Sequence, residues 1–303
     1  MKIVVGVDGS AQALAAARWV VQLPLSSAHE VVVASVAAPP VFIGAWGYVH
    51  TGSSARLLDM AWKAAQHSAR RAAEQAVGEF TGLPCPVHVV IREGHPIEAL
   101  RRVVEELGAD LLVVGPHGRG RLESILLGSV SQSLLHVMPT SILVAREPAR
   151  APERILLAVD GSPHSLAAAR FLARFPLPAG ARIDVLTVVA GSFDGFPEQG
   201  GVDFRDLVTF ERRRAAEVIG EAVAALEAGG RTGQPAIRDG DPKREILAVA
   251  REHESDLIVM GARGVGGFRG LVLGSVSRAV SKAAPCATLV VGHHAGPSEE
   301  GGS

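Results

Sequence analysis

The sequence predicts an α/β protein of two tandem, doubly wound domains, and three observations lead to this. The same order of motifs occurs twice along the chain, and in each half short apolar runs alternate with longer segments of helical pattern. The 303 residues are 48% hydrophobic but only 4% aromatic, a composition typical of aliphatic parallel sheets covered by helices. A chain of this length fits about two domains, each able to bury its own core.

The repeat is visible in three pairs of segments. It predicts domains at residues 1–147 and 153–292, joined by the charged, proline-containing linker 146–153. The tail after Gly292 is expected to be disordered. The paired segments are Val4–Ser10 with Leu156–Ser162, at an offset of 152, and then 94–96 with 240–242 and 115–118 with 261–264, both at an offset of 146.

Each half is expected to contain five strands separated by helices. Four of the strands are short apolar runs, as expected where helices cover both faces of a sheet. Alternating strands and helices imply right-handed crossovers and a parallel sheet. The expected strands of the first half are Ile3–Val7, Val31–Val36, Val87–Arg92, Leu111–Val114 and Ile142–Ala145, and Thr288–Val291 ends the second half.

Local signals support these elements. Ser10 and Ser162 stand where the first helix of each half needs a cap, and Pro163 fits a first-turn position that requires no N–H. A doubly wound sheet binds its ligand at the carboxyl ends of its strands, which is where Asp8 and Asp160 fall. We also expect the halves to pack as a pseudo-twofold pair along their last strands, because pairing would protect two sheet edges.

A glycine motif follows the fourth strand of each half. Gly115-x-x-Gly118 precedes Gly128 by nine intervening residues, and a helical segment follows; Gly261, Gly264 and Gly274 repeat this spacing. Glycines with positive φ would bring backbone N–H groups close to an anion, and the helix would add its positive end. Phosphate suits such a cradle best, and small hydroxyl donors would assist. These donors are Ser129 and Ser131 in the first half, and Ser275 and Ser277 in the second.

Two plainer interpretations remain open at these positions. The glycines can serve only to permit the turn, and each aspartate can serve only to cap the turn that follows it. A turn need not repeat a nine-residue spacing, however, so the repeat favours a binding site. The two loops also differ in charge. Where the first has His117, Arg119 and Arg121, the second has Arg263, Val265 and Gly267, and Arg119 can be either a phosphate ligand or a solvated cation.

Charge and composition bear on partners and location. Thirty basic and thirty-one acidic residues give a net charge of -1, so neither nucleic acid nor an anionic membrane is an expected partner. The uncharged stretch 31–49 contains helix breakers and is expected to be a strand and an apolar loop with Phe42, Trp46 and Tyr48. This loop is a candidate cover for a ligand or contact for a second chain. Two cysteines without metal-ligand spacing fit a cytoplasmic protein.

Both halves resemble universal stress protein domains, through their V-D-G-S segments and the motif G-x2-G-x9-G-[ST]. The resemblance covers nearly all of the chain up to Gly292. It implies five-stranded sheets of order 3-2-1-4-5 and ATP, with or without Mg²⁺, at the strand tips. It places adenine near Asp8 and Asp160, beside the backbone of Val36 and Val188. The full set of expected cofactor-binding residues is Gly6, Asp8, Val36, Gly115, Gly118, Arg119, Gly120, Gly128, Ser129, Val130, Ser131, Asp160, Val188, Gly261, Gly264, Val265, Gly266, Gly274, Ser275, Val276 and Ser277.

Three functions compete at this stage. The favoured one is a nucleotide-dependent regulatory protein of the stress response, with adenine nucleotide, a second copy of the chain and unidentified proteins as partners. A slow ATPase or an adenylyl- or phosphoryl-transfer enzyme is the alternative, and a dimerising scaffold with empty sites is the third. The sequence has no G-x4-G-K-[ST], no G-x-G-x-x-G after the first strand and no metal-ligand pattern of histidines. We therefore expect no catalytic residues and no protein-held metal.

Overall fold

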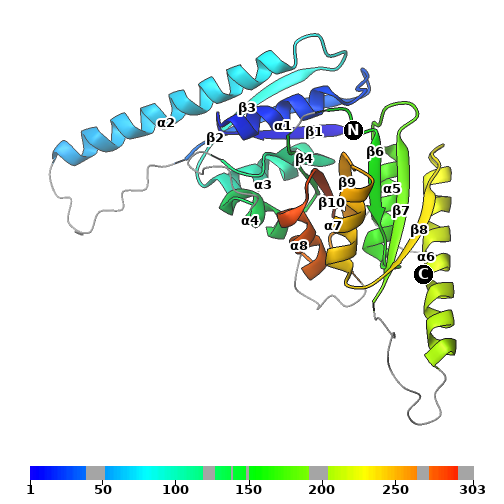
Figure 1. Ribbon diagram of the computed structural model, residues 1–303. Helices are drawn as coiled ribbons and strands as arrows, with labels where there is room; N and C mark the ends of the chain where they lie inside the picture. Colours follow the sequence, from blue (N-terminus) through cyan, green and yellow to red (C-terminus); the bar gives the residue numbers. More distant parts are fainter. Residues whose placement is uncertain are drawn as a thin grey trace, which may run out of the picture. The chain divides into compact units, whose positions relative to one another are not determined.

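The computed structural model describes residues 1–38, 52–118, 127–137, 139–147, 150–190, 204–264 and 273–292, with backbone alone at 52–55 and 204–208 (Figure 1). Several sequence-based expectations lie outside the described residues. These concern the apolar loop with Phe42, Trp46 and Tyr48, the loop residues Arg119, Gly120, Arg121, Val265, Gly266 and Gly267, and the tail after Gly292.

The two halves repeat one order of strands and helices. The first half contains β1 (Lys2–Val7), α1 (Ala11–Val21), β2 (Glu30–Ala37), α2 (Gly52–Glu79), β3 (Val87–Glu93), α3 (Pro96–Leu107), β4 (Leu111–Val114), α4 (Ser129–Val137) and β5 (Ser141–Val144). The second half contains β6 (Arg154–Ala158), α5 (Pro163–Arg174), β7 (Arg182–Val189), α6 (Phe204–Glu227), β8 (Gln234–Asp239), α7 (Pro242–Glu252), β9 (Leu257–Gly261), α8 (Ser275–Ala283) and β10 (Ala287–Val291).

The strand order confirms the doubly wound fold. It is β3-β2-β1-β4-β5 in the first half and β8-β7-β6-β9-β10 in the second, which is 3-2-1-4-5 in both. The strand registers confirm the repeat. Lys2 pairs with Glu30 in the first half, and Arg154 pairs with Arg182 in the second, so both partners are shifted by 152 residues. All the pairs with a described register are parallel. Two helix layers therefore cover each sheet, with α1 against α2, α5 against α6 and α7 against α8.

Contacts divide the chain into two compact units. The first unit consists of residues 1–134 and 144–149, and the second of residues 135–143 and 150–303. Each unit has an aliphatic core at the centre of its sheet, where Leu111 and Leu112 are fully buried in the first unit and Leu156 and Leu157 in the second. Small buried side chains on α1, such as Ala16 and Ala17, let that helix lie close to the strands.

The expected helix caps are present. The hydroxyl of Ser10 accepts a hydrogen bond from the backbone N–H of Ala13 at 3.2 Å, and that of Ser162 accepts from Ser165 at 3.1 Å. Pro163 occupies the first turn of α5, where a missing N–H costs nothing. These caps fix the point at which the chain leaves the first strand of each unit, and so they fix the position of the aspartate just before them.

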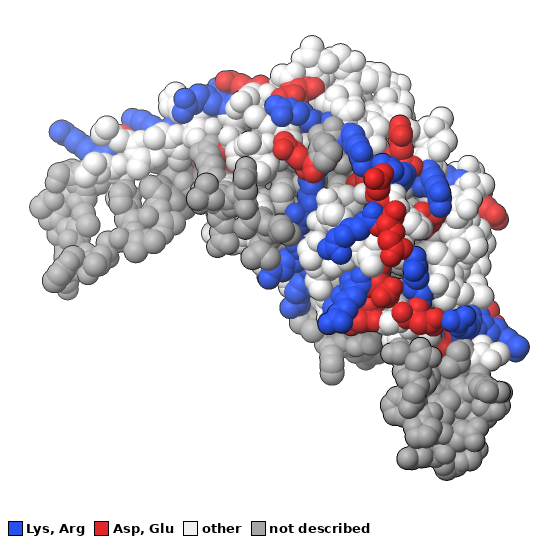
Figure 2. Space-filling view, in the orientation of Figure 1, with Lys and Arg blue, Asp and Glu red and all other residues white. Residues whose placement is uncertain are grey.

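Charged side chains of both signs are interspersed on the face drawn in Figure 2. In the second unit many of them pair, as in the contacts of Arg154 with Glu254 at 2.6 Å and of Arg212 with Asp239 at 2.6 Å. Exposed ion pairs such as these add little to the free energy of unfolding, so they describe the surface more than they explain the fold.

No helix within the described ranges is long and apolar enough to cross a membrane.

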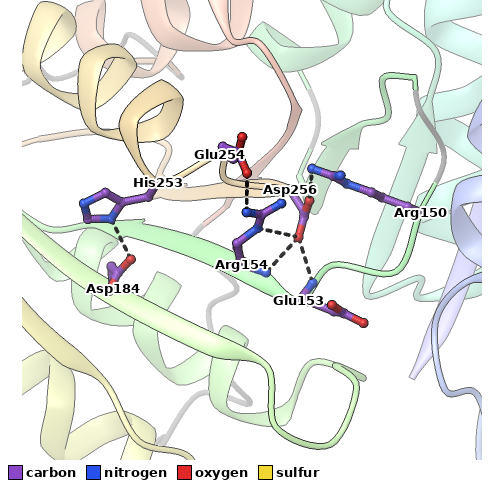
Figure 3. Close-up of polar contacts among 7 residues, drawn as sticks. All are labelled: Arg150, Glu153, Arg154, Asp184, His253, Glu254 and Asp256. Carbon is purple, nitrogen blue, oxygen red and sulfur yellow. Dashed lines mark hydrogen bonds and ion pairs between the residues drawn. The ribbon is translucent and has the colours of Figure 1, made fainter.

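One buried carboxylate holds the start of the second unit. Oδ2 of Asp256 accepts hydrogen bonds from the backbone N–H groups of Glu153 and Arg154 at 3.0 and 2.8 Å, and Arg150 forms an ion pair with Oδ1 at 2.5 Å (Figure 3). Asp110, 146 residues earlier, accepts from the N–H of Lys2 at 2.7 Å. Both aspartates therefore pin the first strand of their sheet beside the fourth, and Asp256 does so with more bonds.

We predict that Asp256→Ala lowers the free energy of unfolding of the second unit by about 2–3 kcal/mol, because it leaves two backbone donors without their charged acceptor. Asp110→Ala is the matched control in the first unit and should cost about 1 kcal/mol, since it removes one such bond. Urea unfolding followed by circular dichroism measures both. Equal losses of unfolding free energy in the two variants would contradict the claim that Asp256 holds its strand with more bonds than Asp110 does.

Candidate functional site

Each unit has a cavity at the carboxyl ends of its strands. The first cavity has a volume of about 340 Å³ and the second about 390 Å³, near the lower end of the roughly 300–1,000 Å³ of small-molecule sites. The first is lined by Asp8, Ser35, Val36, Ala38, Ala65, Ser68, Ala69, Pro96, His117, Gly118, Gly128, Ser129 and Val130. The second is lined by Ala158, Val159, Asp160, Ser165, Leu186, Val188, Ala190, Pro242, Ile246, Met260, Gly261, Arg263, Gly264, Gly274, Ser275, Val276 and Ser277.

The aspartate after the first strand lies against the backbone of the glycine loop. A methyl group added at Gly118 would be 2.5 Å from Oδ2 of Asp8, well inside van der Waals contact. Gly264 has the same relation to Oδ2 of Asp160. A side chain at either glycine would have to push the carboxylate out of this position.

The expectation that the motif glycines take positive φ is wrong. None of Gly115, Gly118, Gly128 and their counterparts in the second unit has φ in the left-handed region. The left-handed glycines are elsewhere, for example Gly9 at φ 81° and Gly161 at φ 79°, directly after the two aspartates. The motif glycines avoid contacts instead of relieving strain. At Gly115 an added methyl would lie 2.6 Å from the carbonyl oxygen of Gln12 on α1.

The fixed spacing of the motif has a structural cause. The N–H of Gly128 donates to the carbonyl of Pro116 at 2.7 Å, and the N–H of Gly274 donates to the carbonyl of Ala262, also at 2.7 Å. A methyl group at Gly128 would lie 3.2 Å from the Cα atom of His117. Each loop is therefore closed at its base, and the start of the next helix is held beside the glycine that contacts the aspartate.

The helix that begins at the second glycine loop has no side-chain cap, a feature that it shares with α3, whose N-cap is His95. The N-caps of α1, α5 and α7 are Ser10, Ser162 and Asp241, and each accepts a hydrogen bond through its side chain. The N-cap of α8 is Gly274, which provides no side-chain cap. The first N–H groups of a helix need acceptors, and an anion can supply them. The N-terminal residues of α8 line the second cavity.

The serines of the motif divide into two kinds. The buried hydroxyl of Ser131 donates to the carbonyl of Gly115 at 2.7 Å, and that of Ser277 donates to Gly261 at 2.7 Å. These two serines thus hold helix to loop, which differs from their expected role as donors to phosphate. Ser129 and Ser275 are exposed, line the cavities and stand at the first helical position.

The aspartates combine two tasks. Oδ1 of Asp8 accepts from the N–H and the hydroxyl of Ser10 at 2.9 and 2.6 Å, and Oδ1 of Asp160 accepts from the N–H of Ser162 at 3.0 Å. The turn-capping interpretation is therefore correct for one oxygen of each carboxylate. Both residues also line a cavity, and Oδ2 of each faces the glycine loop. Capping thus orients the carboxylate at the cavity wall.

Strand β2 and helix α2 supply the opposite wall of the first cavity. Val36 lies there as expected, together with Ala65 and Ala69 of α2. Val188 lines the second cavity. Gly6 does not belong to the described cavity wall: its α-carbon faces Val114 and Leu100, whose side-chain atoms would be 3.2 and 3.4 Å from an added methyl. Gly6 thus provides space for packing beneath the site.

Some cavity residues were not expected from the sequence. Pro96 and Pro242 line the two cavities from the first turns of α3 and α7, and the repeat of their glycine-x-proline segments was a signal that could have found them. His117 and Arg263 occupy matching positions within the glycine motif. No sequence pattern predicted the cavity residues that α2 contributes. The offset between matching residues of the two halves changes before that helix ends, so the repeat does not align them.

Comparisons with known proteins agree with this geometry. The family model of universal stress proteins matches the chain twice, over residues 1–146 and 152–292. The chain belongs to the universal stress protein family. A universal stress protein of Mycobacterium tuberculosis is 30% identical over 309 residues, covering 95% of this chain and 96% of the relative. One of Thermus aquaticus is 36% identical over 141 residues, which is 45% of this chain and 96% of the relative.

The fold is shared with a solved universal stress protein. The match to the crystal structure of a universal stress protein from Archaeoglobus fulgidus covers 97% of this chain and 98% of the solved chain, with a TM-score of 0.65 and 19% sequence identity. At this identity the likeness concerns the fold. Two universal stress protein domains in one chain are therefore shown by sequence and by structure.

We predict that Gly118→Ala disables the first cavity and Gly264→Ala the second, because even a methyl group at either position overlaps the aspartate. On the hypothesis that each cavity binds ATP, isothermal titration calorimetry should count two sites in the wild type and one in each variant. Gly220→Ala is the control: that glycine is in α6 with open space around it, so the change should stabilise the helix by about 0.5–1 kcal/mol and leave binding unchanged. Unaltered stoichiometry in both loop variants would place the site elsewhere.

We also predict that Asp8→Asn separates the two tasks of the carboxylate. The amide oxygen can still accept from Ser10, so the free energy of unfolding should stay within about 1 kcal/mol of the wild-type value. The amide nitrogen can only donate, whereas Oδ2 of the carboxylate can only accept, so ATP affinity at the first cavity should fall about tenfold or more. Asp8→Ala should reduce both stability and affinity. Calorimetry and urea unfolding measure the two effects, and wild-type affinity in Asp8→Asn would show that the carboxylate serves the turn alone.

Proposed function

We propose that this universal stress protein binds one ATP in each unit and acts as a nucleotide-dependent regulator of the stress response, without being an efficient enzyme. The observation that carries the proposal is the cavity in which an aspartate, a closed glycine loop and a helix N-terminus meet, and which occurs in both units. The domains are taken as residues 1–147 and 153–292, in accord with the match of the family model. The protein is placed in the cytoplasm, where ATP is abundant.

The two ends of each cavity suit the two ends of ATP. The loop and helix N-terminus offer backbone N–H groups and an exposed serine hydroxyl, which are the usual partners of phosphate oxygens. The strand end beside Val36 or Val188 offers backbone groups next to apolar side chains, which suits a flat base. The aspartate between them is placed to accept from the ribose or the base.

The role of the individual residues follows from this orientation. Val36 and Val188 face the base, and Asp8 and Asp160 accept hydrogen bonds between base and phosphates. Phosphates are held by the N–H groups of the motif. The motif residues assigned to phosphate are Gly115, Gly118, Arg119, Gly120, Gly128, Ser129 and Val130 in the first unit, and Gly261, Gly264, Val265, Gly266, Gly274, Ser275 and Val276 in the second, with Arg119, Gly120, Val265 and Gly266 assigned by the motif alone.

Magnesium fits the proposal only as part of the nucleotide. Within the described residues no group of three or more His, Cys, Asp and Glu side chains is arranged to hold a metal ion. Each cavity wall, as far as it is described, includes one carboxylate, and one oxygen of that carboxylate accepts from a serine. Mg²⁺ usually takes one or two carboxylates and otherwise phosphate oxygens and water. Asp8 and Asp160 are thus the residues placed to assist a metal carried by ATP.

Binding alone is enough to regulate. A ligand that prefers one arrangement of the loops shifts the protein toward it and so alters the surface that a partner meets. Phosphoryl transfer requires more, because a positioned nucleophile and a clamp on the developing charge must both lie at the γ-phosphate. The described cavity walls offer one acid each, with His117 in the first wall and Arg263 in the second. Each acid is already engaged in a turn and is poorly placed to act as a base, and this supports a binding protein over an enzyme.

We predict that ATP stabilises the protein and is hydrolysed slowly. At a concentration one hundred times its Kd, a ligand that binds only the folded state adds about 2.7 kcal/mol per site, or roughly 5–10 °C in Tm. Phosphate release should stay below the roughly 1 s⁻¹ typical of slow enzymes. A paired thermal-shift and phosphate-release assay measures both quantities.

The loop variants provide the control for that assay. Gly118→Ala and Gly264→Ala should each lose the stabilisation of one site, whereas Gly220→Ala keeps both. Fast phosphate release that disappears in the loop variants would make the protein an enzyme. No thermal shift with any adenine nucleotide would favour a scaffold with empty sites.

A further inference from the structure

We propose that Ser35 is a specificity-determining residue of the first unit, whose hydroxyl hydrogen-bonds the base of the bound nucleotide. The proposal deepens the proposed function and rests on it. It begins from a feature of the first cavity that neither the glycine motif nor the turn-capping aspartate explains. That feature is a buried hydroxyl on β2 that has no partner among the described residues and belongs to a residue of the cavity lining.

The backbone of Ser35 is held in the sheet, whereas its hydroxyl is unpaired. The residue is 1% exposed and lies one residue before Val36 in β2. Its backbone is in register with Val7 of β1 and Ile91 of β3, so the main chain belongs to the interior of the sheet. The residue lines the first cavity, and its Oγ makes no hydrogen bond to any atom within the described ranges.

Some buried hydroxyls of this protein are paired, as in the hydrogen bonds that Ser131 and Ser277 donate to loop carbonyls. Ser141, Thr187 and Thr288 lack a described partner, as Ser35 does, but none of these three lines either described cavity. Leaving a buried hydroxyl unpaired is unfavourable, because it has lost its water and gained no partner. At a cavity wall the missing partner can come from a ligand, and polar groups that converge on a cavity usually set its selectivity.

The side of the cavity identifies the part of the ligand. In the strand order of the first half, β2 lies on one side of β1 and β4 on the other. The glycine loop and α4 follow β4, so the N–H groups for phosphate are on that side. Ser35 is on the β2 side, and the lining there also includes Val36 of the same strand and Ala65, Ser68 and Ala69 of α2. A wall of small, uncharged side chains accommodates a flat base.

The repeat supplies a matched control. Thr187 is the counterpart of Ser35 at the offset of 152, and it is likewise buried with a hydroxyl that has no partner in the described part of the chain. Thr187 is not among the described residues that line the second cavity, although Leu186 and Val188 are. The proposal therefore applies to Ser35 alone and gives the two units different means of reading the base.

The test compares ATP affinity and unliganded stability in two variants. Ser35→Ala is measured by calorimetry in a Gly264→Ala background, so that only the first site contributes. Thr187→Val is measured in a Gly118→Ala background, so that only the second contributes. We expect Ser35→Ala to weaken ATP binding about tenfold, ~1.4 kcal/mol, while its Tm without ligand is unchanged or higher. Thr187→Val should have wild-type affinity and the same unchanged or higher Tm.

Three outcomes in the variants overturn the proposal, and a fourth, in the wild type, refutes the proposed function. ATP affinity within twofold of the matched background in Ser35→Ala overturns the proposal, and so does a lower Tm without ligand, because the hydroxyl would then have a structural partner. Equal weakening by Thr187→Val also overturns it, since the effect would come from the strand and not from the cavity. Absence of ATP binding in the wild type would refute the proposed function itself. Titration of the unmodified chain under the same conditions distinguishes this result from failure of the proposal for Ser35.

Discussion

The close approach of one carboxylate to one glycine organises each half of this protein. The aspartate that follows the first strand lies against the backbone of the loop after the fourth strand, at a distance at which any side chain on that loop residue would displace the carboxylate. The serine cap of the first helix orients the carboxylate, and the hydrogen bond that closes the loop fixes the backbone. Strand order brings the two together, because β4 pairs directly with β1, as β9 does with β6.

This constraint explains why the site is built from so few side chains. When the backbone approaches a carboxylate so closely, the loop presents N–H groups, and the helix that follows begins without a side-chain cap in the second unit. The serine hydroxyls that look available in the sequence are partly engaged in holding helix to loop. Under the proposed function, the groups that hold the ligand therefore belong mainly to the main chain, and side chains such as Ser35 and Arg263 distinguish one cavity from the other.

The fold could be predicted almost entirely from the sequence, whereas only one wall of the site could. Apolar runs and the repeat predicted the strands, and Ser10 and Ser162 predicted the caps. Spacing also located the loop beside the aspartate, although the reason given for the glycines, positive φ, was wrong: spacing shows that a glycine is required but does not show whether conformation or contact requires it. The wall formed by Ala65 and Ala69 had no signal, because small residues on a helix look alike wherever they face.

The central claim is that the Asp–Gly contact in each unit forms a nucleotide site. Native mass spectrometry of the full chain with ATP tests it most directly, because it counts ligands on each molecule. The account predicts species with two ATP molecules for the wild type, one for either Gly118→Ala or Gly264→Ala, and none for the double variant. Two bound ATP molecules in the double variant would contradict it.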